Sequence, residues 1–381
     1  MLYRAPVAPD DGGVIGSFNP NPDLSDAEYV ARLERRLSVL TAAKPLGLAD
    51  LCPGMGGAFP DLIAAVGGER VLALPANGAR LHEARPHESP GRGEWFFTEA
   101  TSEALGSRAR GSGSALLLGT PSVSENVDGG LLIDSSPYAS ERFAMGAVVQ
   151  MLSTVESAEI GEDQFDWAIV DPPWYGPAVI DWLARASRWV RPGGLINVVL
   201  FGDLTRPSAA RERAAVMEVA SLIGELEIEP ASIRYETPRF EQRALVAAGL
   251  PALRDWRCAD LLIVRKSRAL EMPPQNDASS DWIDYRLGDN IICARRSSLA
   301  RPRQGPVLEP VVPATQGWTA ATVSRRAPEI MRADLWTSDN TVARVNDWPA
   351  VMSMIHEFNR GGEAADDKRR LFAQLFGGQE C

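Results

Sequence analysis

Short apolar runs alternate with polar, helix-compatible segments from Glu94 to about Lys266. Apolar runs bounded by turn residues are typical of buried strands. Strands that alternate with helices predict a mostly parallel sheet, and therefore an α/β fold. Strands are expected at 115–118, 131–133, within 146–152, and at 165–170, 195–201, 226–234 and 259–265. A helix is expected at 178–189, closed by a turn at 191–194.

The chain on either side of this core has a different pattern. A helix is expected at 23–43, where N-cap candidates precede a stripe of apolar residues at helical spacing. Beyond residue 270 we expect one strand at 290–294, a helix around 348–358 and a helical tail. We therefore divide the chain into an N-terminal helical extension (1–90), an α/β domain (91–270) and a C-terminal extension (271–381).

Composition is that of a globular protein, with 45% hydrophobic and 23% charged residues. The apolar runs are too short to span a bilayer, and the first residues lack a signal pattern, so we expect a cytoplasmic protein without membrane contact. Scattered cysteines and three histidines predict no metal site. The net charge is −11, but residues 181–330 carry 21 Lys and Arg against 18 Asp and Glu. If the protein has a basic face, it must therefore come from this middle third.

The tetrapeptide Asp171-Pro172-Pro173-Trp174 directly follows the apolar run of the fourth strand. Open α/β sheets bind their ligands at the carboxyl ends of strands. Proline fixes φ and lacks an N–H, while an ionised aspartate only accepts hydrogen bonds. Asp171 and the Pro172 carbonyl can therefore accept both hydrogens of an exocyclic NH2 on adenine. Trp174 can stack on the base, at about 1–3 kcal/mol, and Tyr175 can form a second wall.

A plainer interpretation of the same residues is a proline-rich loop that ends a strand, with Trp174 in the core. The buried strand before the motif, the aromatic residue in its fourth place and the helix after it favour the functional interpretation. Such a turn assists methyl transfer mainly by positioning the amine and stabilising charge, rather than by removing a proton.

The loop Gly119-Thr120-Pro121-Ser122 follows the first strand, where a doubly wound fold binds its cofactor. Gly119 permits close backbone approach, and two hydroxyls stand beside it. Asp134 ends the second strand, where an acid accepts the ribose hydroxyls of a nucleoside cofactor. This order predicts S-adenosylmethionine as the methyl donor. No Gly-x-Gly-x-x-Gly follows the first strand, which disfavours a dinucleotide.

A second glycine-rich segment, 54–57, is a weaker candidate for the cofactor loop. The strand expected after it ends without an acid, and it lies far from Asp171 in sequence. We interpret it as a turn or a helix N-terminus of the N-terminal extension.

The stretch from Glu94 to Lys266 resembles the probable N6-adenine methyltransferase family. The resemblance rests on Trp95-Phe96-Phe97-Thr98-Glu99, on the loop 119–122 and on residues 165–174. It implies a Rossmann-like class I methyltransferase sheet over 91–270, S-adenosylmethionine as cofactor, and the tetrapeptide 171–174 as the acceptor clamp. We expect Trp95 and Phe97 to lie at the acceptor site with Tyr175. The loop lacks the pattern Phe-x-Gly-x-Gly, and the terminal extensions match no known family.

Three functions stay open at this point. The first is an N6-adenine methyltransferase acting on RNA or DNA, favoured by the clamp and by the arginines of the middle third. The second is a methyltransferase for lysine or another side-chain nitrogen of a protein, which suits the acidic chain. The third is a catalytically silent binding or scaffold subunit, with a protein partner bound through the terminal extensions.

Overall fold

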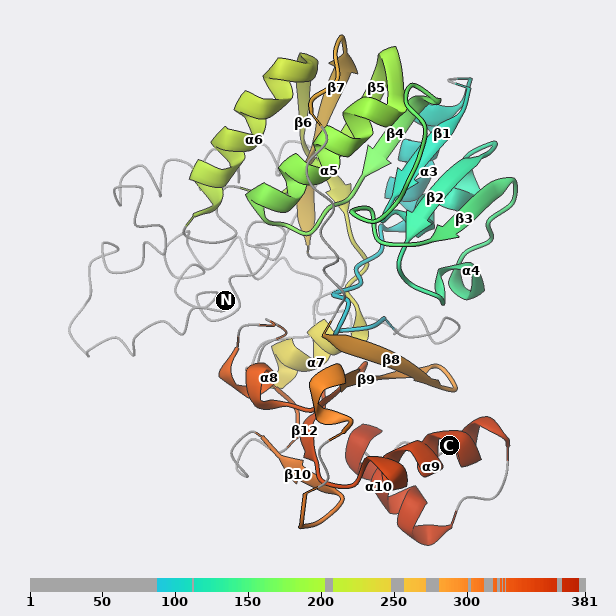
Figure 1. Ribbon diagram of the computed structural model, residues 1–381, viewed down its shortest axis with the longest axis vertical. Helices are drawn as coiled ribbons and strands as arrows, with labels where there is room; N and C mark the ends of the chain where they lie inside the picture. The colour runs from blue at the N-terminus through green and yellow to red at the C-terminus, as the bar shows by residue number, and fades with distance from the viewer. Residues whose placement is uncertain are drawn as a thin grey trace, which may run out of the picture.

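The computed structural model describes part of the chain (Figure 1). The described residues are 88–111, 113–202, 208–247, 257–271, 281–300, 303–311, 318–320, 323, 325, 327–361 and 365–376. The helix predicted at 23–43 and the glycine-rich segment 54–57 lie outside them.

A seven-stranded sheet occupies the upper half of Figure 1. Its strands are β1 (Ala115–Leu118), β2 (Gly130–Asp134), β3 (Val148–Leu152), β4 (Phe165–Val170), β5 (Val190–Leu200), β6 (Gly224–Arg234) and β7 (Cys258–Lys266). Their order is β3-β2-β1-β4-β5-β7-β6, and β7 runs antiparallel to both of its neighbours. This order with its reversed strand is that of the Rossmann-like class I methyltransferase fold, which confirms the predicted fold class.

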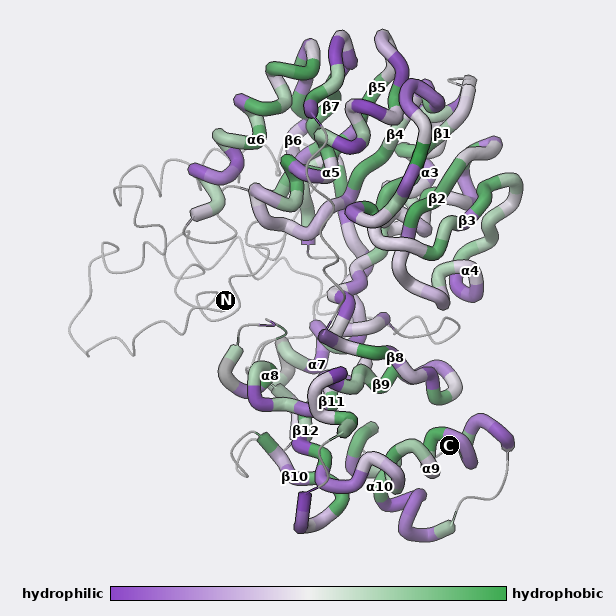
Figure 2. The backbone as a smooth tube through the Cα atoms, in the orientation of Figure 1, coloured by the Kyte–Doolittle hydropathy of each residue, from purple (hydrophilic) through white to green (hydrophobic). Residues whose placement is uncertain are grey.

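Helices cover both faces of this sheet. The helices α5 (Gly176–Trp189) and α6 (Ala209–Ile223) pack on the face that includes Leu116 and Leu118 of β1. The opposite face, with Leu117, packs against α3 (Glu99–Ala109). The strands of this sheet include many of the most hydrophobic positions of the chain (Figure 2). Each fully buried leucine contributes roughly 1.5–3 kcal/mol to the stability of the fold, so this three-layer core holds the loops at its strand ends in place.

Several details of this half differ from the predictions. Residues 191–194 are not a closing turn: α5 ends at Trp189, and β5 begins at Val190 and includes them. A register shift between Phe165 and Trp167 accommodates the longer strand. The helix α6 was not predicted. The polar stretch before β7 contains a further helix, α7 (Arg239–Ala247), and short helices η4 (Pro121–Asn126) and α4 (Ala139–Arg142) follow β1 and β2.

A second, five-stranded sheet follows in the C-terminal part of the chain. Its strands are β8 (Trp282–Leu287), β9 (Asn290–Arg295), β10 (Leu308–Pro310), β11 (Leu335–Thr337) and β12 (Val342–Val345), in the order β10-β12-β11-β9-β8. All of its pairings are antiparallel. The prediction of a single strand in 270–310 was therefore wrong: β9 is the predicted one, and β8 and β10 accompany it.

Helices also cover this C-terminal sheet. The helices α9 (Trp348–Asn359) and α10 (Asp366–Phe376), both predicted, pack on one face. The helix α8 (Pro328–Arg332) packs on the other face with Trp282 and Trp336. A three-residue 3-10 helix, η5 (Arg296–Ser298), follows β9.

Ion pairs join the two halves of the molecule. Arg239 on α7 pairs with Asp339, in the turn between β11 and β12, and both side chains are more than nine-tenths buried. Arg92, in the segment before α3, pairs with the buried Asp284 on β8 at 2.6 Å. Removing one partner of a buried pair costs about 3–5 kcal/mol, so these contacts hold the halves together. The domain division stays a prediction.

Candidate active site

The carboxyl ends of β1, β2 and β4 lie side by side. The Asp171 N–H donates to the Leu118 carbonyl at 3.0 Å, and the Gly119 N–H donates to the Ile133 carbonyl at 2.9 Å. The parallel register β2-β1-β4 therefore joins the predicted cofactor loop, the acid of β2 and the predicted clamp at one edge of the sheet.

Gly119 meets a steric requirement at this edge. Its φ is +66°, a conformation that side chains rarely adopt. A Cβ there would lie 3.1 Å from the Trp182 ring and 3.3 Å from the Asp171 carbonyl oxygen. The cofactor loop and the clamp therefore approach each other closely at a residue without a side chain.

The rest of the predicted cofactor loop is buried. Thr120 is 1% exposed, and its hydroxyl has no hydrogen-bond partner among the described residues. Pro121 begins η4, and the Ser122 hydroxyl accepts the Phe97 N–H at 3.3 Å. Ser122 thus fastens the 95–97 segment to the loop, while Thr120 keeps an unused polar atom.

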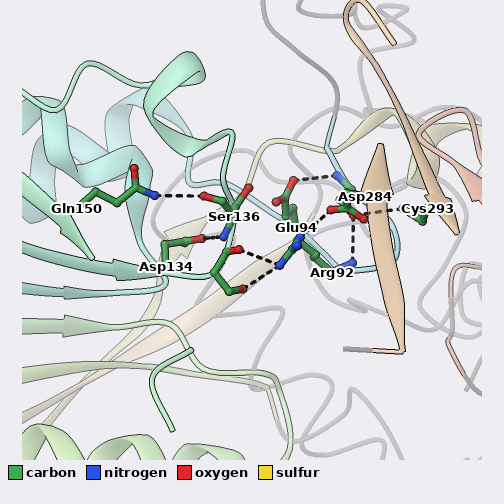
Figure 3. A network of polar contacts seen from close by, with 9 residues as sticks. Arg92, Glu94, Asp134, Ser136, Gln150, Asp284 and Cys293 are labelled. Carbon is green, nitrogen blue, oxygen red and sulfur yellow. Dashed lines mark hydrogen bonds and ion pairs between the residues drawn. The ribbon is translucent and has the colours of Figure 1, made fainter. Parts of the chain in front are cut away.

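Asp134 ends β2 and faces a turn that it helps to hold (Figure 3). Its carboxylate accepts the Ser136 N–H at 2.6 Å. Burial raises the pKa of Asp134 to about 6, against the Ser136 hydrogen bond and the charge of Arg92. The Asp134 carboxylate and the unpartnered Thr120 hydroxyl fit the polar groups of a nucleoside sulfonium donor, so these residues suit S-adenosylmethionine.

Asp171 is half-buried and has one strong partner. The Tyr235 hydroxyl donates to its Oδ1 at 2.6 Å. Burial raises the pKa of Asp171 to about 7, while the Tyr235 hydrogen bond and the charge of Arg257 lower it. A carboxylate accepts up to about four hydrogen bonds, so Asp171 can accept one from an amine in addition to the one from Tyr235.

The two prolines differ in whether their carbonyl oxygens already accept a hydrogen bond. The Pro173 carbonyl accepts the Tyr175 N–H at 2.6 Å and is used by the turn itself. In the described residues, no N–H donates to the Pro172 carbonyl. The clamp therefore offers the acceptors that the sequence analysis proposed, Asp171 and Pro172. The helix α5 starts directly afterwards, and its Gly176 N–H donates to Glu212 at 2.7 Å.

Trp174 already has a cation on its ring. The guanidinium carbon of Arg257 lies 3.7 Å from the Trp174 ring centroid and 4.5 Å from that of Trp95. The Tyr235 ring meets Trp174 edge-on, with centroids 5.8 Å apart. Burial lowers the pKa of Arg257, and the neighbouring Tyr235, Asp171 and Glu241 oppose this shift. An acceptor base on this ring face has to displace Arg257 or stack elsewhere.

The three residues predicted to contact the acceptor differ in position. Trp95 lies beside the clamp, because Arg257 bridges its ring and that of Trp174. Tyr175 is 46% exposed at the start of α5. Phe97 is only 3% exposed and packs against Tyr235, with centroids 5.1 Å apart. Phe97 therefore packs against the Tyr235 ring in the core, and we assign Phe97 no contact with a substrate.

Sequence reasoning missed Tyr235, Arg257 and Glu241. Tyr235 follows β6, and Arg257 immediately precedes β7, so both reach the clamp from the ends of these two strands. Glu241 on α7 is 6% exposed, and its Oε2 has no hydrogen-bond partner. Burial raises the pKa of Glu241 to about 7, against the charge of Arg257. The position of Tyr235 and Arg257 at strand ends was the available signal, but no local motif marks it.

Comparisons with known proteins find similar solved structures but no relative by sequence. No protein-family model matches the sequence, and no curated protein matches it significantly. The branched-chain polyamine synthase of Thermus thermophilus is similar in structure, with 15% identity and a TM-score of 0.41 over 60% of this chain and 69% of that chain. The tRNA (m1A58) methyltransferase TrmI of Aquifex aeolicus superposes at 13% identity and a TM-score of 0.33, over 49% of this chain and 74% of its own.

A third similar structure is the N-methyltransferase NodS of Bradyrhizobium japonicum, at 12% identity and a TM-score of 0.30, over 44% of this chain and 95% of that chain. These superpositions are partial, so the substrate has to be argued from the residues of this chain. The strand order gives the class: a protein with the fold of S-adenosylmethionine-dependent methyltransferases.

Two further findings concern the described residues alone. They contain no cluster of three or more His, Cys, Asp or Glu side chains that could hold a metal ion. Within the same ranges, no helix is long and apolar enough to cross a membrane.

Proposed function

We propose that this protein is an S-adenosylmethionine-dependent N-methyltransferase that modifies the exocyclic N6 amine of adenine in RNA or DNA. The observation that carries the proposal is the clamp. Asp171 and the Pro172 carbonyl stand at the carboxyl end of β4, directly beside the Gly119 loop of β1. In this proposal the amine acceptor and the nucleoside donor bind next to each other at this edge.

In this proposal the residues of the chain mainly hold and orient. The amine donates one hydrogen bond to Asp171 and one to the Pro172 carbonyl, which directs its lone pair away from both. The sulfonium donor, when bound, supplies an electrophilic methyl group, whose carbon–sulfur bond breaks as the carbon–nitrogen bond forms. The proton released from nitrogen passes to solvent or to Asp171, whose pKa of about 7 suits it for that exchange.

The base needs a platform, and Trp174 is the candidate. The Arg257 guanidinium is a planar group of sp2 nitrogens, and it lies 3.7 Å from the ring centroid. The amidine-like edge of adenine, with N1, C6 and N6, has the same planar arrangement. Arg257 therefore lies on the Trp174 ring, where we propose that the base stacks.

The same observation favours a second candidate, a methyltransferase for a side-chain nitrogen of a protein. Arg257 is itself a cationic protein side chain, held among the rings of Trp174 and Trp95 and near the acids Asp171 and Glu241. A lysine or arginine of a partner protein suits such a site, because aromatic rings and carboxylates both stabilise a cation.

A transfer assay separates the two candidates. The purified protein is mixed with donor labelled in its methyl group and, separately, with RNA, DNA and protein pools, with Asp171→Ala as the matched control. The proposal expects label on adenine in a nucleic acid pool for the wild type only. Label on protein alone supports the second candidate, and the absence of label in every pool contradicts both.

A further inference from the structure

Arg92 joins the end of β2 to the C-terminal sheet (Figure 3). Its Nε donates to Asp284 Oδ2, on β8, at 2.6 Å. Its Nη1 donates to the Ser135 carbonyl at 2.9 Å and to the Ser135 hydroxyl at 3.2 Å. One side chain thus connects the turn after β2 to a strand far away in the sequence.

This turn sets the orientation of Asp134. The Ser136 N–H donates to the Asp134 carboxylate at 2.6 Å, and Gln150 on β3 donates to the Ser136 carbonyl at 3.1 Å. Gln150 therefore holds the turn from the side of the large sheet, and Arg92 holds it from the side of the C-terminal sheet.

Two carboxylates around Arg92 keep an unpartnered oxygen. In the part of the chain that the structure describes, Asp284 Oδ1 has no nitrogen or oxygen donor, and the Cys293 thiol lies beside this 1%-exposed side chain. Glu94 Oε1 is also buried without a partner, while its Oε2 accepts the Ser89 N–H at 2.8 Å. Buried carboxylate oxygens normally have a hydrogen-bond donor, so these two oxygens keep acceptor capacity in the neighbourhood of Asp134.

We propose that Asp284 is a positioning residue of the donor site: it holds Arg92 against the Ser135–Ser136 turn, and so fixes Asp134 for the donor. The inference rests on the proposed function, because it takes S-adenosylmethionine as the ligand at β2. Its consequence is that the C-terminal sheet is part of the donor site and not only an appended extension.

Calorimetry with S-adenosylhomocysteine on the full chain tests the inference. Asp284→Ala frees the Arg92 guanidinium, so the Kd should rise about tenfold or more. Arg92→Ala should raise it similarly, and the double variant should be no weaker than the worse single variant, because both remove one connection. Asp284→Asn keeps an oxygen for Arg92 and should recover most of the affinity. At saturating donor, kcat of the variants should stay near that of the wild type.

Asp334→Ala is the matched control, since it removes another buried acid of the same sheet, one paired with Arg303. It should lower the melting temperature about as much as Asp284→Ala does, without changing the Kd. An unchanged Kd in Asp284→Ala, or an equal rise in Asp334→Ala, overturns the inference while the proposed function stands. A wild-type protein that does not bind S-adenosylhomocysteine overturns both.

Discussion

The proposed donor side and the proposed acceptor side of this sheet edge are built differently. On the donor side the Thr120 hydroxyl and Glu94 Oε1 are buried without partners. On the acceptor side the main groups already have internal partners: Tyr235 donates to Asp171, and Arg257 covers Trp174. The donor side therefore keeps polar atoms for a ligand, whereas on the acceptor side a base that stacks on Trp174 has to displace Arg257.

This difference determines where acceptor specificity originates. Stacking of a base on an aromatic ring contributes about 1–3 kcal/mol. A cation on the same ring contributes about 0.5–2 kcal/mol, which is lost when Arg257 leaves. The net gain at Trp174 is then small, so the hydrogen bonds to Asp171 and to the Pro172 carbonyl have to select the acceptor.

The largest predicted effect is on the acceptor side. Asp171→Ala removes the carboxylate that orients the amine, so turnover should fall by about 10³-fold. The affinity for S-adenosylhomocysteine should change little, because donor binding depends on the other side. Single-turnover transfer and calorimetry on the same preparation measure both quantities. A parallel loss of donor affinity contradicts the separation of the two sides.

The next effect is on the donor side. Asp134→Ala removes a charged hydrogen-bond acceptor, worth roughly 1.5–3 kcal/mol, so donor affinity should fall by about one to two orders of magnitude. Turnover at saturating donor should recover most of its wild-type value. Titration of the variant with S-adenosylhomocysteine checks this, and wild-type affinity would remove Asp134 from the donor site.

A smaller effect is expected at the stacking platform. Trp174→Ala should raise the KM for an adenine-containing oligonucleotide by only about a few-fold, because the lost stacking is offset by the Arg257 contact that the base no longer has to displace. Trp174→Phe should lose less, because a ring remains. Donor affinity should stay within a few-fold in both variants. If the two variants have the same KM as the wild type, the base does not stack on Trp174.

The smallest effect concerns pH. Asp171 acts in its ionised form, so the rate should rise with pH through its pKa of about 7 and then level off. The charge of Arg257 favours the carboxylate, so Arg257→Ala should move the midpoint to higher pH, by about one unit. Rate profiles between pH 5.5 and about 9 compare the two proteins. A shift towards lower pH contradicts the assigned interaction.

The sequence predicts most of the donor half but little of the C-terminal half. The strand β1 is short, fully buried and uniformly apolar, and β4 is apolar and buried except at Asp166, so their pattern is visible without a structure. The strand β8 mixes apolar, charged and polar residues, and β11 has three residues, so neither has a readable period. Their pairing depends on contacts between distant segments, which no local pattern encodes.

The candidate site also has one part that the sequence predicts and one part that it does not. The tetrapeptide from Asp171 to Trp174 is contiguous and could be interpreted from its own chemistry. Tyr235 and Arg257 reach it from the ends of β6 and β7, and only the antiparallel pairing of those strands brings them to the clamp. Arg92 and Asp284 likewise meet only because the segment before α3 lies against β8.

The central claim is that the rigid turn after β4 presents the amine of adenine to a methyl donor. Mass spectrometry of nucleosides, and of proteins, from cells with the wild-type chain, with Asp171→Ala and without the chain tests it most directly. The account predicts additional N6-methyladenosine or its deoxy form in cells with the wild-type chain alone. Equal nucleoside profiles in all three, or methylation confined to protein, would contradict it.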